Sequence, residues 1–135
     1  MIDRLEQKGL VTRNVSRADR QLWDDFHADP EAVAAMARRL GMKHTTFRNA
    51  SGLPDNAQVT TARDMAVLGR ALQNDFPRDF KYFSVQSFKW NGNTYSNHNR
   101  LLGRVKGVNG IKTAYTRASG FNLLSSAKRG RREII

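Results

Sequence analysis

The sequence of 135 residues has no cysteine, only three prolines and no apolar run of membrane-spanning length. Without cysteine, disulfides, thiolate catalysis and cysteine-ligated zinc are excluded. The opening segment MIDRLEQKGL has no apolar region typical of a signal peptide, so the chain as written is expected in the cytoplasm. Acidic residues are also few, since 12 Asp and Glu face 23 Lys and Arg. The net charge of +11 favours a polyanionic partner, such as nucleic acid, anionic lipid or an acidic cell-wall polymer. The alternative interpretation is a protein with a basic surface and no such partner.

Two segments carry the signals of amphipathic helices. Over 29–41, Asp29 is placed to cap the helix and Pro30 suits its first turn. The predicted buried face of this helix has apolar residues at three- and four-residue spacing: Val33, Met36, Ala37 and Leu40. Over 60–77, Thr61 and Asp64 have the spacing of a capping box. The predicted buried face of this second helix consists of Met65, Leu68, Leu72 and Phe76.

The last third of the chain is rich in strand signals. Asn91-Gly92 lies between two strand-like runs, which predicts a tight hairpin. Residues 107–116 predict a strand, and residues 120–135 predict a strand, a basic turn and a further strand. A short strand is also expected near 42–47. Helices followed by neighbouring antiparallel strands favour an α+β domain.

From residue 29 onward, four segments resemble a known family in its order and spacing. They are MARRLGMKHTTFRNASGLPD, TTARDMAVLGRAL, DFPRDFKYFSVQSFKWNGNTYSNHNRLL and GVNGIKTAYTRASGFNLLSSAKR. The family is that of the serine D-alanyl-D-alanine carboxypeptidases, the low-molecular-mass penicillin-binding proteins. The resemblance implies an incomplete β-lactamase/transpeptidase-like α+β domain over 23–135, with helices packed on an antiparallel sheet. It also implies a periplasmic or cell-envelope location, peptidoglycan stem peptides as substrates, β-lactams as inhibitors, and no metal or organic cofactor.

That family uses three motifs, Ser-x-x-Lys, Ser-x-Asn and Lys-Thr-Gly, of which only the third has a counterpart here. The counterpart is Lys112-Thr113-Ala114. An ammonium and a hydroxyl at the rim of a strand can bind a substrate carboxylate by charge-assisted hydrogen bonds. By resemblance, the backbone amide of Tyr115 would stabilise the developing oxyanion. Without the surrounding match, a solvated lysine beside a β-forming threonine would be the simpler interpretation.

The chain departs from the family pattern at two points. Ala114 replaces the family's glycine, and its methyl group shares a strand face with Lys112, which predicts weakened substrate binding. No Ser-x-x-Lys precedes the strand; Ser125 and Lys128 have the spacing but follow it, and we interpret them as a coincidence. The chain is therefore expected to be a fragment that holds the substrate without catalysing the reaction alone.

Residues 1–22 resemble instead the wing of a MarR-type winged-helix regulator, and form a predicted leader segment. By that resemblance Arg13, Arg17 and Arg20 would contact DNA. Two alternative functions therefore stay open beside the carboxypeptidase fragment. One is a piece of a DNA-binding regulator, and the other is a non-catalytic module that binds peptidoglycan carboxylates.

Overall fold

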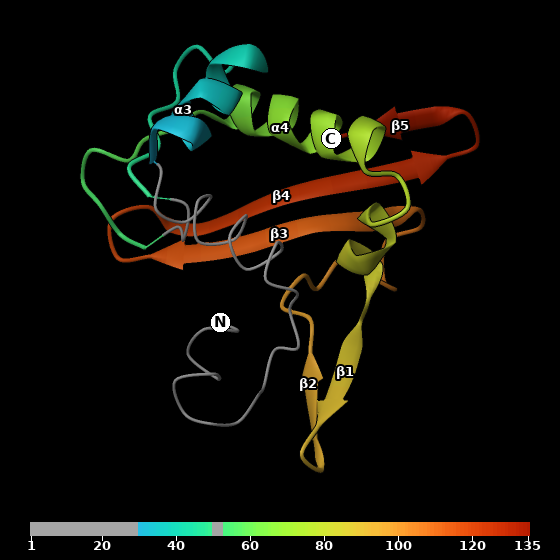
Figure 1. Cartoon of the computed structure of the whole chain (residues 1–135). Coiled ribbons are helices and arrows are strands. Elements are labelled where there is room, and N and C mark those ends of the chain that lie inside the picture. The colour runs from blue at the N-terminus through green and yellow to red at the C-terminus, as the bar shows by residue number, and fades with distance from the viewer. Residues whose placement is uncertain (1–29, 50–52) are drawn as a thin grey trace, which may run out of the picture.

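The computed structural model describes residues 30–49 and 53–135, and the predicted Asp29 cap and the wing-like segment 1–22 lie outside them. Figure 1 shows helices on one side of a twisted sheet and a hairpin on the other side. The elements in chain order are α3 (Pro30–Arg39), α4 (Ala62–Asp75), the 3-10 helix η1 (Phe80–Ser84), β1 (Ser87–Trp90), β2 (Asn93–Ser96), β3 (Val108–Thr116), β4 (Gly120–Arg129) and β5 (Arg132–Ile134). The predicted α+β class is confirmed.

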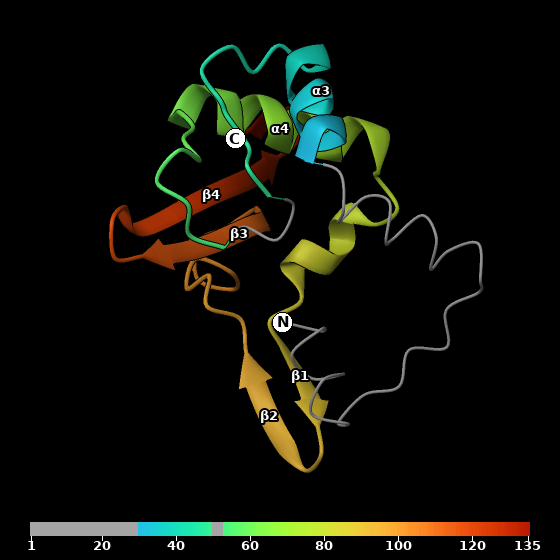
Figure 2. The ribbon, with the colours of Figure 1, turned by 60° about the vertical axis from the view of Figure 1, so that its left-hand side comes forward.

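The strands form two antiparallel sheets, β1-β2 and β3-β4-β5, where the sequence suggested one. The segment between β2 and β3 turns the chain away, and Figure 2 shows the hairpin projecting from the main sheet. The hairpin turn is the one expected from the sequence, because Asn91 and Gly92 both have positive φ, 46° and 75°. Such a turn matches the twist of the strands that it joins.

Helix α4 begins as the sequence predicts. The Thr61 side chain accepts a hydrogen bond from the Asp64 amide at 3.1 Å. The Asp64 carboxylate is buried, and it accepts hydrogen bonds from the His44 amide at 2.8 Å and the Thr45 hydroxyl at 2.7 Å. One side chain therefore joins the start of α4 to the segment that follows α3.

Two residues assigned to buried helix faces are exposed. Met36 is 49% exposed, and its neighbour Ala37 takes the buried position on α3. Phe76 is 56% exposed because it is the C-cap of α4, where φ and ψ leave the helical range and helical spacing no longer sets the direction of the side chain. The short strand expected near 42–47 is reduced to a single bridge between Thr46 and Val59.

The hydrophobic core lies between the main sheet and the elements packed on it. Its buried apolar side chains among the described residues are Ala37, Met42, Phe80, Leu102 and Ile111. η1 packs against β3, and α4 packs against β4. Gly69 allows α4 to approach the sheet closely, because a β-carbon there would lie 3.0 Å from Ile111 Cδ1. Among the described residues, neither helix is long and apolar enough to cross a bilayer.

Candidate functional site

The four predicted site residues lie consecutively in the second half of β3. Lys112 and Ala114 pair with Leu124 and Asn122 of β4, and they share one face of the strand because side chains alternate. Thr113 lies on the opposite face and is half-buried, whereas Lys112 is exposed. The ammonium and the hydroxyl therefore reach a common ligand only across the strand edge.

That edge is open within the described part of the chain. β3 pairs with β4 alone, so its other side carries backbone groups with no partner strand there. The Lys112 ammonium bends back onto the backbone and donates a hydrogen bond to the Thr113 carbonyl oxygen. No carboxylate among the described residues forms an ion pair with Lys112. An anion at this edge would meet an uncompensated positive charge.

Tyr115 continues the site on the face of Thr113. Its side chain is 63% exposed, and its ring lies against the ring of Phe121 on β4, with centroids 4.6 Å apart. Phe121 is itself 91% exposed. The two rings form an apolar surface on the Thr113 face of the strand, suited to the non-polar part of a ligand.

The start of β3 is held by a buried amide. Asn99 is 4% exposed, and its Nδ2 donates to the Gly110 carbonyl oxygen at 3.0 Å while its Oδ1 accepts from the Leu101 amide at 3.1 Å. The Ser125 hydroxyl also donates to the Gly110 carbonyl oxygen, at 3.2 Å. The link from Asn99 to the site strand was not predicted, because local sequence does not show which distant carbonyl lies opposite.

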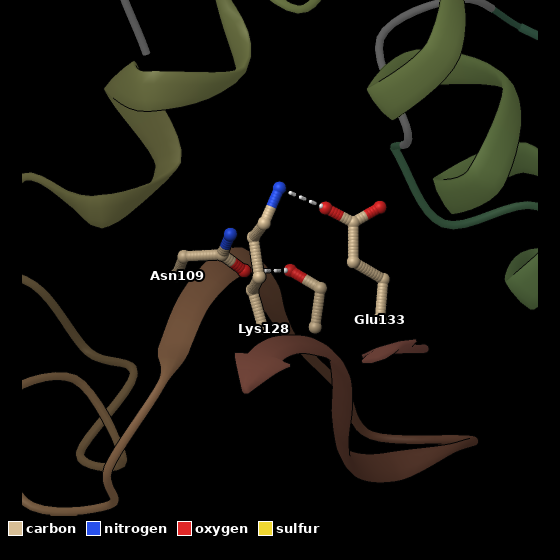
Figure 3. A network of polar contacts seen from close by, with 4 residues as sticks. Asn109, Lys128 and Glu133 are labelled. Atoms are coloured by element: carbon tan, nitrogen blue, oxygen red, sulfur yellow. Dashed lines mark hydrogen bonds and ion pairs between the residues drawn. The ribbon is translucent and has the colours of Figure 1, made fainter. Parts of the chain in front are cut away.

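Figure 3 shows a second anchor and the position of Lys128. The buried Ser126 hydroxyl donates to Asn109 Oδ1 at 2.8 Å, and Lys128 Nζ pairs with the Glu133 carboxylate at 2.7 Å. Ser125 and Lys128 are three positions apart on a strand, so their side chains leave it on opposite faces. Each is engaged with another partner, so they do not form a nucleophile and base pair.

The antiparallel sheet with helices on one side and Lys112 on its edge strand fits the class of transpeptidase-like penicillin-binding proteins, and superposition on solved structures shows that fold. The Listeria monocytogenes penicillin-binding protein D2 in its ampicillin-bound form superposes with a TM-score of 0.70 at 31% identity, covering 82% of this chain and 46% of that one. Penicillin-binding protein 5 of Haemophilus influenzae superposes with a TM-score of 0.69 at 34% identity, covering 75% and 30%.

Sequence comparison then identifies the family. The D-alanyl-D-alanine carboxypeptidase family profile matches residues 31–135. The carboxypeptidase DacC of Escherichia coli is 40% identical over 133 residues, which cover 95% of this chain and 33% of DacC. The chain therefore belongs to the D-alanyl-D-alanine carboxypeptidase family, and it spans about a third of the length of that relative.

Proposed function

We propose that this chain is the substrate-holding part of a serine D-alanyl-D-alanine carboxypeptidase that acts on peptidoglycan stem peptides. Lys112 and Thr113 bind the terminal carboxylate of the peptide, and the Tyr115 amide stabilises the oxyanion. The observation that carries the proposal is the Lys112 ammonium at the edge strand β3, where it has no carboxylate partner and β3 has no second partner strand among the described residues. A carboxylate there gains a charge-assisted hydrogen bond, and an extended peptide can run beside the unpaired strand edge.

We further propose that these 135 residues bind the peptide without cleaving it. Hydrolysis through an acyl-enzyme requires an activated nucleophile beside the bound carbonyl. The sequence has no Ser-x-x-Lys ahead of β3, and the side chains of Ser125 and Lys128 are directed apart. In this proposal the serine and its base come from outside the 135 residues.

Fluorescent penicillin labelling tests the catalytic part of the proposal. We expect no covalent band on the isolated chain, and a strong band on DacC treated in the same way as a positive control. A band on the isolated chain that disappears in Ser125→Ala would contradict our interpretation of Ser125. A band that persists in this variant would show that another serine in the chain acts as a nucleophile.

Retention on insoluble peptidoglycan tests the binding part. Lys112→Ala should lose about 10- to 150-fold in affinity, because charge-assisted hydrogen bonds contribute about 1.5–3 kcal/mol. Lys89→Ala is the matched control, since Lys89 is equally an exposed strand lysine but lies on the β1-β2 hairpin. Equal losses in the two variants would show that binding depends on net charge, and would remove Lys112 from the site.

A non-catalytic peptidoglycan-binding module would behave in the same way in the retention assay. Genomic sequence upstream of this chain separates the two proposals, because the fragment requires a Ser-x-x-Lys half nearby and the module does not. Binding of β-lactams and a cell-envelope location follow from the fragment proposal, and this location replaces the cytoplasmic one expected from the first residues.

The DNA-binding alternative has no support in these comparisons. The relatives matched are carboxypeptidases, and the DacC match covers 95% of the chain, so it includes most of residues 1–22. The division into a leader over 1–22 and a domain over 23–135 stays a prediction. A gel shift with duplex DNA of different sequences would test the DNA-binding alternative. A regulator must prefer particular sequences, whereas salt-sensitive binding without sequence preference is expected of any basic protein.

A further inference from the structure

Two segments far apart in the sequence come together at the end of the main sheet where β4 leads into β5. The Lys128 amide donates a hydrogen bond to the Gly107 carbonyl oxygen at 2.8 Å, and Arg129 Nε donates to the Lys106 carbonyl oxygen at 3.0 Å. Figure 1 shows the β4-β5 turn projecting at this end. The exposed cations of the two segments lie at this end of the sheet, with Lys128 on one face of β4 and with Arg129 and its partner Arg132 on the other. We call these six residues together the basic patch: Arg104, Lys106, Lys128, Arg129, Arg131 and Arg132.

The positive charge of the basic patch is hardly compensated. Glu133 is the one acidic residue within 104–107 and 128–133, and it pairs with Lys128 (Figure 3). The other five cations form no ion pair with any residue that the structure describes. Like charges held together repel one another, so such an arrangement favours an anionic partner.

The surroundings of the basic patch favour a lipid surface over nucleic acid. Neither segment contains an aromatic side chain on which a base could stack, and neither is a helix that could enter a groove. Val105 lies between Arg104 and Lys106 and is 38% exposed. Basic side chains next to an exposed aliphatic one suit a bilayer interface, where phosphates lie above apolar chains.

We propose that the basic patch docks the protein on a membrane surface rich in anionic phospholipids. The guanidinium and ammonium groups bind headgroup phosphates, and Val105 contacts the interface below them. This role is separate from the β3 edge, because it uses the opposite end of the strand pair, so either proposal can fail without the other.

Vesicle co-sedimentation tests the proposal, using phosphatidylcholine alone and an equal mixture with phosphatidylglycerol. We expect binding to the mixed vesicles only, weakening from low to physiological salt. Arg131→Gln/Arg132→Gln should lower the partition coefficient about 30-fold, since each basic residue near an anionic surface contributes about five-fold. Arg63→Gln/Arg70→Gln is the matched control, because these two exposed arginines lie on α4, outside the two segments of the basic patch. It should lower the coefficient less than about three-fold, as expected for screened charges outside the binding surface.

Three results would overturn the proposal. The first is an absence of binding to the mixed vesicles at low salt. The second is an equal loss in the two double variants, which would show that only net charge matters. The third is a loss of duplex DNA binding in Arg131→Gln/Arg132→Gln with lipid binding unchanged, which would make nucleic acid the partner. Circular dichroism of each variant establishes that the fold is kept.

Discussion

The link between Asn99 and the start of β3 allows the most direct test of how the site strand is held. Asn99→Ala removes two hydrogen bonds, one to the Gly110 carbonyl oxygen and one from the Leu101 amide. Gly110 keeps the hydroxyl of Ser125 as a donor, so the first loss costs about 1 kcal/mol. The Leu101 amide loses its side-chain acceptor, which costs about 1–2 kcal/mol more.

The free energy of unfolding should therefore fall by about 2–3 kcal/mol in Asn99→Ala. Urea unfolding followed by circular dichroism measures it, and the midpoint should shift by about 1–2 M, given a typical slope of about 1–3 kcal/mol/M. Asn122→Ala is the matched control, because Asn122 is exposed on β4 and its amide bonds only with the adjacent turn. Its loss should stay within about 0.5 kcal/mol.

A midpoint for Asn99→Ala that equals that of the wild type would refute this reasoning, as would equal shifts in both variants. In either case the buried amide would not hold the strand. If the reasoning is right, retention on peptidoglycan by Asn99→Ala should also fall in conditions where the variant is folded, because the start of β3 sets the position of Lys112 two residues later.

Three further predictions concern single positions. Gly107→Ala should lower the free energy of unfolding by roughly 3 kcal/mol in urea titrations, because φ is +86° there and the added β-carbon would lie 2.3 Å from the Lys128 carbonyl oxygen; an unchanged midpoint would contradict that contact. The hydrogen bond from the Thr45 hydroxyl lowers the pKa of Asp64 below its usual 3.8 despite burial. The carboxylate therefore stabilises the fold above the unfolded-state pKa, and this stability is lost as pH falls through the lower folded-state value, so Asp64→Asn should flatten acid unfolding below about pH 4. Ala114→Gly should strengthen binding of a D-alanyl-D-alanine peptide several-fold in fluorescence titration, and equal affinities would show that the methyl group does not obstruct the site.

The elements with local signals were predicted well. Asn91-Gly92 marked the hairpin turn, and Thr61 with Asp64 marked the start of α4, because turns and caps depend on residues a few positions apart. Exposure was predicted less well. Phe76 follows the helical spacing but lies beyond the last turn of α4, where that spacing no longer applies.

The residues of the site were predicted from the sequence, but their three-dimensional arrangement was not. Lys112 and Thr113 were identified from the family motif, and the structure adds that they lie on opposite faces of a strand with one free edge among the described residues. The sequence did not predict which side chains hold the strand in position. Asn99 and Ser125 meet at one carbonyl oxygen only because the segment before β3 and the middle of β4 fold against each other.

By itself, the sequence determined the two longer helices, the hairpin, the strands of the last third of the chain and the family, since capping, turn formation and side-chain alternation act between near neighbours in the chain. Only the tertiary structure decided that the site strand has one open edge among the described residues, that a buried asparagine holds its first residues, and that two separate basic segments meet at one end of the sheet. These features depend on contacts between residues distant in the sequence, and such contacts exist only after the core has brought the segments together.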